Sequence, residues 1–188
     1  MTELTKTGKT LEFVIALLLI SVGVVLRLLP HAPNFTPIAT IALFGGAYFS
    51  RKTAFILPIV AMLVSDAFLG FYEPKLMMSV YGSFVLTILL GLWLKNHKKW
   101  YTVAGATILS STLFFLITNF SFWAFGHWYA KSFSGLVQCY LMALPFFRNT
   151  LLGDAFFVLV LFGTYELMEV WIRATFKLKE KSPNYVKI

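Results

Sequence analysis

The sequence predicts an all-α integral membrane protein, a bundle of six transmembrane helices with a capping interfacial helix before the last span. The 188-residue chain is 59% hydrophobic and only 13% charged, whereas soluble domains are about 45–50% apolar and about 25% charged. A water-soluble fold would leave too few polar residues to cover its surface. The single cysteine excludes an intrachain disulfide. Lipid must therefore cover much of this chain.

Six predominantly apolar stretches follow one another along the chain. A helix of about 20 residues crosses roughly 30 Å of hydrocarbon, so we expect each stretch to be a span. The expected spans are Leu11–Leu29, Thr36–Phe49, Thr53–Phe71, Leu76–Leu94, Tyr101–Gly126 and Asn149–Ile172. The second span is short and contains Gly45-Gly46-Ala47, which is typical of helices whose backbones approach closely.

The segment Ser132–Phe147 is uncharged but is interrupted by Gly135 and Pro145. We therefore expect it to form an interfacial or partly re-entrant helix that caps the bundle. No repeat or linker divides the chain, so residues 1–188 are predicted to form a single membrane domain. Residues 1–10 and about 177–188 are its expected cytoplasmic tails.

The distribution of Lys and Arg predicts the orientation. With six spans and the N-terminus inside, twelve basic residues fall inside: Lys6, Lys9, Arg51, Lys52, Lys95, Lys98, Lys99, Arg173, Lys177, Lys179, Lys181 and Lys187. Four fall outside: Arg27, Lys75, Lys131 and Arg148. This bias follows the positive-inside rule and predicts a multi-pass protein of the cytoplasmic (inner) membrane with both termini in the cytoplasm. The net charge of +8 thus reports topology, and we expect no nucleic-acid partner.

Polar residues from separate spans gather in the outer half of the expected bundle. Ionisable groups in hydrocarbon are costly and usually face a bundle interior or a wet cavity. Mixed with Trp and Tyr, they have the make-up of a small-molecule pocket open to the outside. We expect Asp66 and Asp154 to serve binding more than folding. The alternative is that Asp66 and Asp154 pair with Arg27 and Arg148 and only tie the helices together.

Five segments carry a resemblance to a known family. They are RLLPHAPNFTPIATIALFGGAYF (Arg27–Phe49), PIVAMLVSDAFLGFY (Pro58–Tyr72), VYGSF (Val80–Phe84), TNFSFW (Thr118–Trp123) and LPFFRNTLLGD (Leu144–Asp154). Over about residues 11–170 the chain resembles a bacterial family of small membrane proteins assigned to transport. That family is similar to the substrate-binding S components of energy-coupling-factor (ECF) vitamin transporters and to the solitary cobalamin transporter BtuM.

The resemblance implies an S-component-type bundle that takes up a small vitamin-like solute, with a corrinoid as the first choice. The implied pocket residues are Arg27, His31, Asn34, Asp66, Tyr81, Asn119, Trp123, Arg148, Asn149 and Asp154. His31, His127 and Cys139 lie on the expected outer side, where a neutral imidazole or a thiolate is a suitable axial ligand for the cobalt of a corrinoid. The protein itself is expected to hold no cofactor and no metal of its own.

One feature departs from the family pattern. S components that dock on a shared energising ATPase module commonly show Ala-x-x-x-Ala in their first helix, whereas Leu11–Leu29 contains only Ala16. This departure favours a solitary carrier over one that needs the module. No Walker A motif occurs, so any ATP use requires a partner.

Two other classes of function compete with transport. A non-transporting assembly or regulatory subunit would bind no stoichiometric small ligand. An intramembrane enzyme is the weaker alternative, because HExxH and GxSxG motifs are absent. We therefore expect no enzyme activity, with a small solute and the lipid bilayer as the partners.

Overall fold

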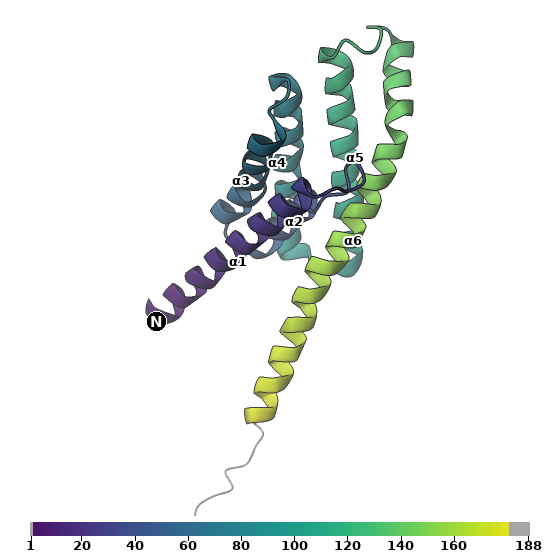
Figure 1. The fold of residues 1–188 in the computed structure, drawn as a ribbon. Helices are drawn as coiled ribbons and strands as arrows, with labels where there is room; N and C mark the ends of the chain where they lie inside the picture. The colour runs from purple at the N-terminus through teal and green to yellow at the C-terminus, as the bar shows by residue number, and fades with distance from the viewer. Residues whose placement is uncertain (1, 181–188) are drawn as a thin grey trace, which may run out of the picture.

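The computed structural model describes residues 2–180, and side chains within 10–171, as an all-helical protein (Figure 1). Its helices are α1 (Thr2–Leu28), α2 (Ile38–Tyr48), α3 (Arg51–Leu69), α4 (Pro74–His97), α5 (Trp100–Phe125) and α6 (Phe133–Glu180). Five of them are long and apolar enough to cross a membrane, and α2 is the shorter apolar helix. The chain is therefore a multi-pass membrane protein by length and composition, with five long spans where the sequence predicted six.

Helix α2 is too short to cross a bilayer. Its 11 residues extend about 16 Å at 1.5 Å per residue, roughly half the hydrocarbon thickness. It lies in the middle of the bundle (Figure 1) and packs against α3, α4 and α6. Nine of its residues are buried, from Ile38 to Ala47. Its apolar sequence thus reflects burial in protein on every side, which sequence alone does not distinguish from exposure to lipid.

Helices α2 and α4 come into backbone contact at two glycines. A Cβ atom placed on Gly46 would lie 2.7 Å from the Cα of Gly91, a distance that real side chains do not reach. The close approach expected from Gly45-Gly46-Ala47 is therefore confirmed, and its partner is α4. Glycine is required here because only its missing side chain lets two helix axes come this close.

The prediction of a separate capping helix over Ser132–Phe147 is wrong. Residues 133–147 are the first part of the continuous 48-residue helix α6, which contains Pro145. Gly135 does not interrupt the helix because it lies in the first turn, where its N–H bonds the Ser132 hydroxyl at 3.2 Å. Proline is tolerated inside membrane helices when neighbouring groups satisfy the freed backbone. Helices α5 and α6 consequently form one long hairpin (Figure 1).

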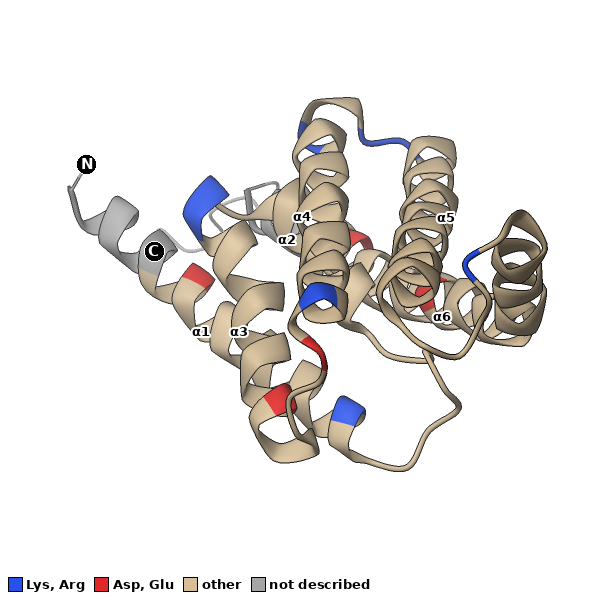
Figure 2. Cartoon of the chain, turned by 90° about the horizontal axis from the view of Figure 1, so that it is seen from above, with Lys and Arg blue, Asp and Glu red and all other residues tan. Residues whose placement is uncertain are grey.

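Local signals explain where α3 begins and ends and where α4 begins. Ser50 caps α3 by accepting a hydrogen bond from the Thr53 N–H, and Gly70, with φ of +95°, ends it. Glu73 caps α4 in the same way, with Pro74 in the first turn. Charged residues lie mainly at helix ends and connections, and most of the helical length carries none (Figure 2).

Candidate functional site

A pocket of about 330 Å³ opens between α4, α5 and α6. We call it the α4–α6 pocket. It is lined by Pro33, Asn34, Tyr72, Leu76, Ser79, Val80, Phe114, Phe115, Thr118, Asn119, Phe122, Phe146 and Thr150. Below it, a cavity of about 40 Å³ shares Asn34, Phe114 and Thr150 and adds Thr36, Ala39, Phe84 and Asp154. We call this smaller space the floor cavity.

The connection between α1 and α2 closes the pocket because α2 is short. Since α2 crosses only part of the bundle, the connection before it runs along the pocket, where Pro33 and Asn34 form part of the wall. Phe35 anchors them: its ring lies 5.5 Å from that of Phe157, and a Cβ on Gly153 would be 3.2 Å from its Cα. Asn34 adopts the left-handed backbone conformation with φ of 63°, which Asn tolerates better than most residues. This turn presents Asn34 to both spaces.

Asp66 and Arg27 form a buried ion pair beside the pocket. Nη1 of Arg27 lies 2.6 Å from Oδ1 of Asp66, whose side chain is 1% exposed. The Tyr81 hydroxyl donates to Oδ2 of Asp66 at 2.8 Å. Arg27 also donates to the Ser65 hydroxyl and to the Met62 carbonyl oxygen. Arg27, Asp66 and Tyr81 therefore connect α1, α3 and α4 and do not line the α4–α6 pocket.

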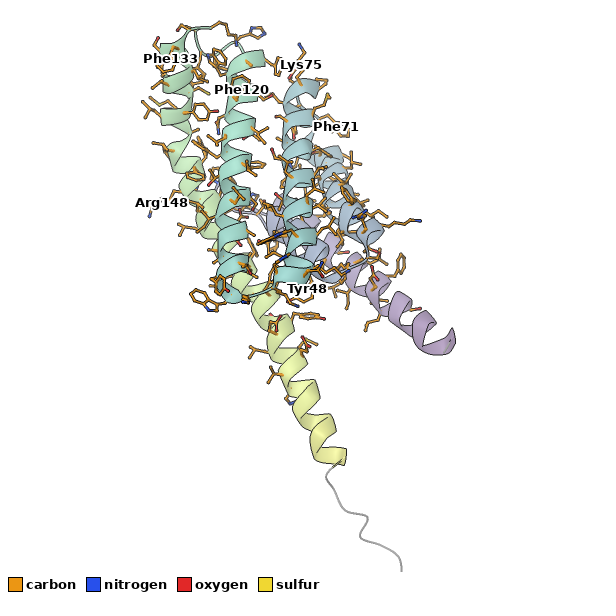
Figure 3. All side chains as sticks on the ribbon, turned by 180° about the vertical axis from the view of Figure 1, so that it is seen from behind. Tyr48, Phe71, Lys75, Phe120, Phe133 and Arg148 are labelled. Atoms are coloured by element: carbon orange, nitrogen blue, oxygen red, sulfur yellow. The ribbon has the colours of Figure 1, made fainter. Side chains whose placement is uncertain are left out.

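Asp154 has a different environment. It is 2% exposed, lines the floor cavity, and its Oδ2 accepts a hydrogen bond of 2.6 Å from the Ser111 hydroxyl. No ion pair with Arg148 forms within the described part of the chain. Arg148 is exposed and points away from the bundle (Figure 3). The pairing alternative is thus correct for Asp66 and wrong for Asp154.

Trp123 and Asn149 lie outside the two spaces. The Trp123 indole donates to the Ala130 carbonyl oxygen at 2.9 Å, and Lys131 donates to the Trp123 carbonyl oxygen. Trp123 therefore fixes the connection between α5 and α6. Asn149 is half-buried on α6. Asn119 does line the pocket, and its side-chain amide donates to the Phe115 carbonyl oxygen at 2.7 Å.

The three candidate axial ligands do not line the pocket either. His31 and His127 are exposed in connections, and Nδ1 of His31 lies 2.6 Å from the Leu29 carbonyl oxygen. Cys139 is 2% exposed and its thiol donates to the Asn119 carbonyl oxygen at 3.5 Å. Within the described residues, no group of three His, Cys, Asp or Glu side chains comes together to hold a metal ion.

Sequence reasoning missed most of the pocket wall. Phe114, Phe115, Phe122 and Phe146 lie in apolar stretches, where a phenylalanine facing a cavity resembles one facing lipid. Ser111 carried a usable signal, because adjacent hydroxyls at Ser110-Ser111-Thr112 are unusual within an apolar span. Such residues hydrogen-bond within their own helix or across to the next one.

Tyr72 lies in the connection between α3 and α4, at the pocket wall. Burial, followed by the negative charge of Asp66, raises the pKa of Tyr72 to about 12. Its hydroxyl is therefore neutral across the physiological range and available as a hydrogen-bond donor.

A larger hollow, of about 670 Å³, is a groove between the first half of α5 and the middle of α6. Lys98, Lys99, Trp100 and Glu166 stand at its polar end, where Lys98 lies 3.5 Å from Glu166. The remaining lining is almost wholly apolar, and Leu159 is 75% exposed. This groove belongs to the lipid-facing surface, so the smaller α4–α6 pocket is the better candidate site.

Comparison with known proteins gives one match. A family model described as a family of unknown function (DUF6580) matches residues 8–176. No curated protein and no solved structure matches the chain.

Proposed function

Since the chain belongs to the family of unknown function DUF6580, whose description carries no activity, we propose a function from its own residues. It is a membrane protein that binds a small vitamin-like solute in the α4–α6 pocket and takes it up across the membrane. It acts as a carrier and not as an enzyme. The absence of Ala-x-x-x-Ala from the first helix supports action without a shared ATPase module.

The observation that carries the proposal is the chemistry of the pocket wall. It combines four phenylalanines with amide and hydroxyl groups from Asn34, Tyr72, Ser79, Thr118 and Asn119. Apolar and aromatic walls with a few placed polar groups are the general make-up of small-molecule sites. Ser79, Thr118 and Asn119 each donate at 2.7 Å to a carbonyl oxygen of their own helix, and their side-chain oxygen atoms can still accept a hydrogen bond from a ligand.

The pocket favours a compact, flat, partly polar heterocycle. Its volume of about 330 Å³ is near the lower limit of the roughly 300–1,000 Å³ typical of ligand sites. A corrinoid, the first choice from the sequence, would require α4, α5 and α6 to separate. The positions of His31, His127 and Cys139 away from the pocket also argue for a smaller solute.

The positive-inside rule supports the direction of transport. Five basic residues lie at helix ends or in connections at the end that contains Tyr48, opposite Lys75 and Phe133 (Figure 3): Arg51, Lys52, Lys95, Lys98 and Lys99. This distribution supports a cytoplasmic location for the Tyr48 end. The pocket residue Leu76 lies one turn from the start of α4, so the pocket faces the outside.

Mass spectrometry of the full chain purified in mild detergent tests the proposal. We expect one small compound at near-stoichiometric amount. Ser79→Phe, which fills the pocket, should lose the compound, whereas Met78→Phe should retain it because Met78 is 76% exposed and points elsewhere. Absence of any compound would favour a non-transporting assembly or regulatory subunit. Retention by the Ser79→Phe variant would place the ligand at another site.

A further inference from the structure

The two buried aspartates differ in one respect that bears on the ligand. Asp66 has a counter-ion, the Arg27 guanidinium at 2.6 Å. Asp154 is buried as deeply, at 2% exposed, but among the described residues its side chain bonds a neutral hydroxyl group, that of Ser111, and no cation. A buried carboxylate without a cation is strongly disfavoured unless another positive group compensates it.

The groups that face Asp154 are uncharged on every side. Ser111 faces it from α5 and Thr150 from α6. The α1–α2 connection contributes Asn34 and Thr36, and α4 contributes Phe84. From α2, Thr40 donates to the backbone carbonyl of Asp154 at 3.4 Å. Within the described part of the chain, no Lys, Arg or His side chain lines either space.

Only one partial positive charge is nearby. The first turn of α2 reaches the floor cavity at Ala39, and a helix N-terminus carries about half a unit of positive charge. This compensates an ionised Asp154 in part and leaves the floor cavity net negative. The floor cavity adjoins the α4–α6 pocket through Asn34, Phe114 and Thr150, so a bound solute can reach Asp154.

We propose that the solute supplies the missing counter-ion of Asp154. The substrate class is then a compact aromatic or heterocyclic cation, such as a ring with a protonated amine, an amidinium or a charged ring nitrogen. The cationic group sits in the floor cavity against Asp154, and the ring lies among the phenylalanines of the α4–α6 pocket. This inference rests on the proposed function and specifies its substrate.

Three probes of nearly identical shape test the charge preference. Benzamidine carries one positive charge, benzamide is neutral and benzoate carries one negative charge. Affinities are measured by ligand-detected NMR titration of the full chain in nanodiscs of zwitterionic lipid, with empty nanodiscs subtracted. We expect benzamidine to bind at least about tenfold more tightly than benzamide, and benzoate to bind most weakly.

Two variants assign the preference to one carboxylate. Asp154→Asn keeps the shape and the Ser111 hydrogen bond, and should reduce the preference for benzamidine to within about twofold while benzamide affinity is unchanged. Glu73→Gln removes the same charge from an exposed position outside the pocket and should keep the preference. Size-exclusion profiles check that both variants fold.

Each remaining outcome is decisive. Equal binding of benzamide and benzamidine by the unaltered chain overturns the inference, and is what a carboxyl already carrying a proton would give. A preference for benzamidine that survives in the Asp154→Asn variant also overturns it. In both cases the pocket still binds rings and the proposed function stands. If none of the three probes binds, the pocket accepts no flat ring, and the proposed function fails instead.

Discussion

At the scale of single residues, two aspartates of similar burial have different surroundings because their neighbours differ. Asp66 accepts from both Arg27 and Tyr81 and joins three helices. Asp154 accepts from Ser111 alone and faces a cavity. Burial by itself therefore does not separate a structural carboxylate from a ligand-binding one. The presence or absence of a counter-ion does.

We expect Asp66→Asn to destabilise the protein more than Asp154→Asn. Removing the charge of Asp66 leaves the guanidinium of Arg27 largely buried without its anion, and breaking such a pair costs roughly 3 kcal/mol. Asp154→Asn loses no ion pair within the described residues. Thermal unfolding of both variants in the same detergent measures the difference. A lower melting temperature for Asp154→Asn than for Asp66→Asn would contradict these assignments.

At the scale of elements, helix α2 decides where the site lies. It is half the length of a span, and its deep burial depends on contact with α4 at Gly46 and Gly91. Because α2 starts inside the bundle, the connection before it closes the α4–α6 pocket instead of lying at the membrane surface. A longer α2 would move Asn34 away from Asp154 and remove the floor cavity.

We expect Gly91→Ala to cost about 1–3 kcal/mol, because a methyl group there meets the backbone of α2 at Leu43 and Gly46. The matched control is Gly82→Ala on the same helix, where a Cβ meets nothing within 4 Å. Alanine favours helix over glycine, so the control should be as stable as the unaltered chain or more stable. Denaturant or thermal unfolding in detergent compares them. Equal stability of the two variants would mean that α2 and α4 are not in backbone contact.

At the scale of the whole molecule, the start of the first helix and the end of the last helix lie at the same end of the bundle. The start of α1 and the end of α6 both point toward the Tyr48 end, away from Lys75 and Phe133 (Figures 1 and 3). The Tyr48 end is also tied together by polar contacts: the Tyr48 hydroxyl donates to Glu166 at 2.7 Å, and Lys95 donates to the Phe49 carbonyl oxygen at 3.0 Å. Five long helices and the shorter α2 together return the chain to its starting side.

We expect an impermeant maleimide to label His127→Cys in intact cells and Asn96→Cys only after permeabilisation. Both positions are exposed, His127 between α5 and α6 and Asn96 near the end of α4. Cys139→Ala provides the background, since Cys139 is the only native cysteine. Labelling of Asn96→Cys in intact cells would show that the orientation is the opposite one and that the α4–α6 pocket faces the cytoplasm.

The sequence by itself determined the class of this protein. Composition and the length of the apolar stretches depend only on transfer between water and lipid, so they identify membrane helices without knowledge of packing. Gly45-Gly46 indicated a close helix contact before its partner was known, because residues without a side chain let helix backbones approach. Of the pocket residues that the resemblance implied, Asn34 and Asn119 line the α4–α6 pocket and Asp154 lines the floor cavity.

Only the tertiary structure decided which helices span and which residues line the site. Helix α2 and a true span are equally apolar, because burial in protein and exposure to lipid impose the same composition. The continuity of α6 through Pro145 could not be predicted from the sequence, because a proline can either end a membrane helix or be tolerated within it. Asp66 and Asp154 differ in whether a basic side chain from another helix lies beside the carboxylate. That difference depends on how the helices pack in three dimensions.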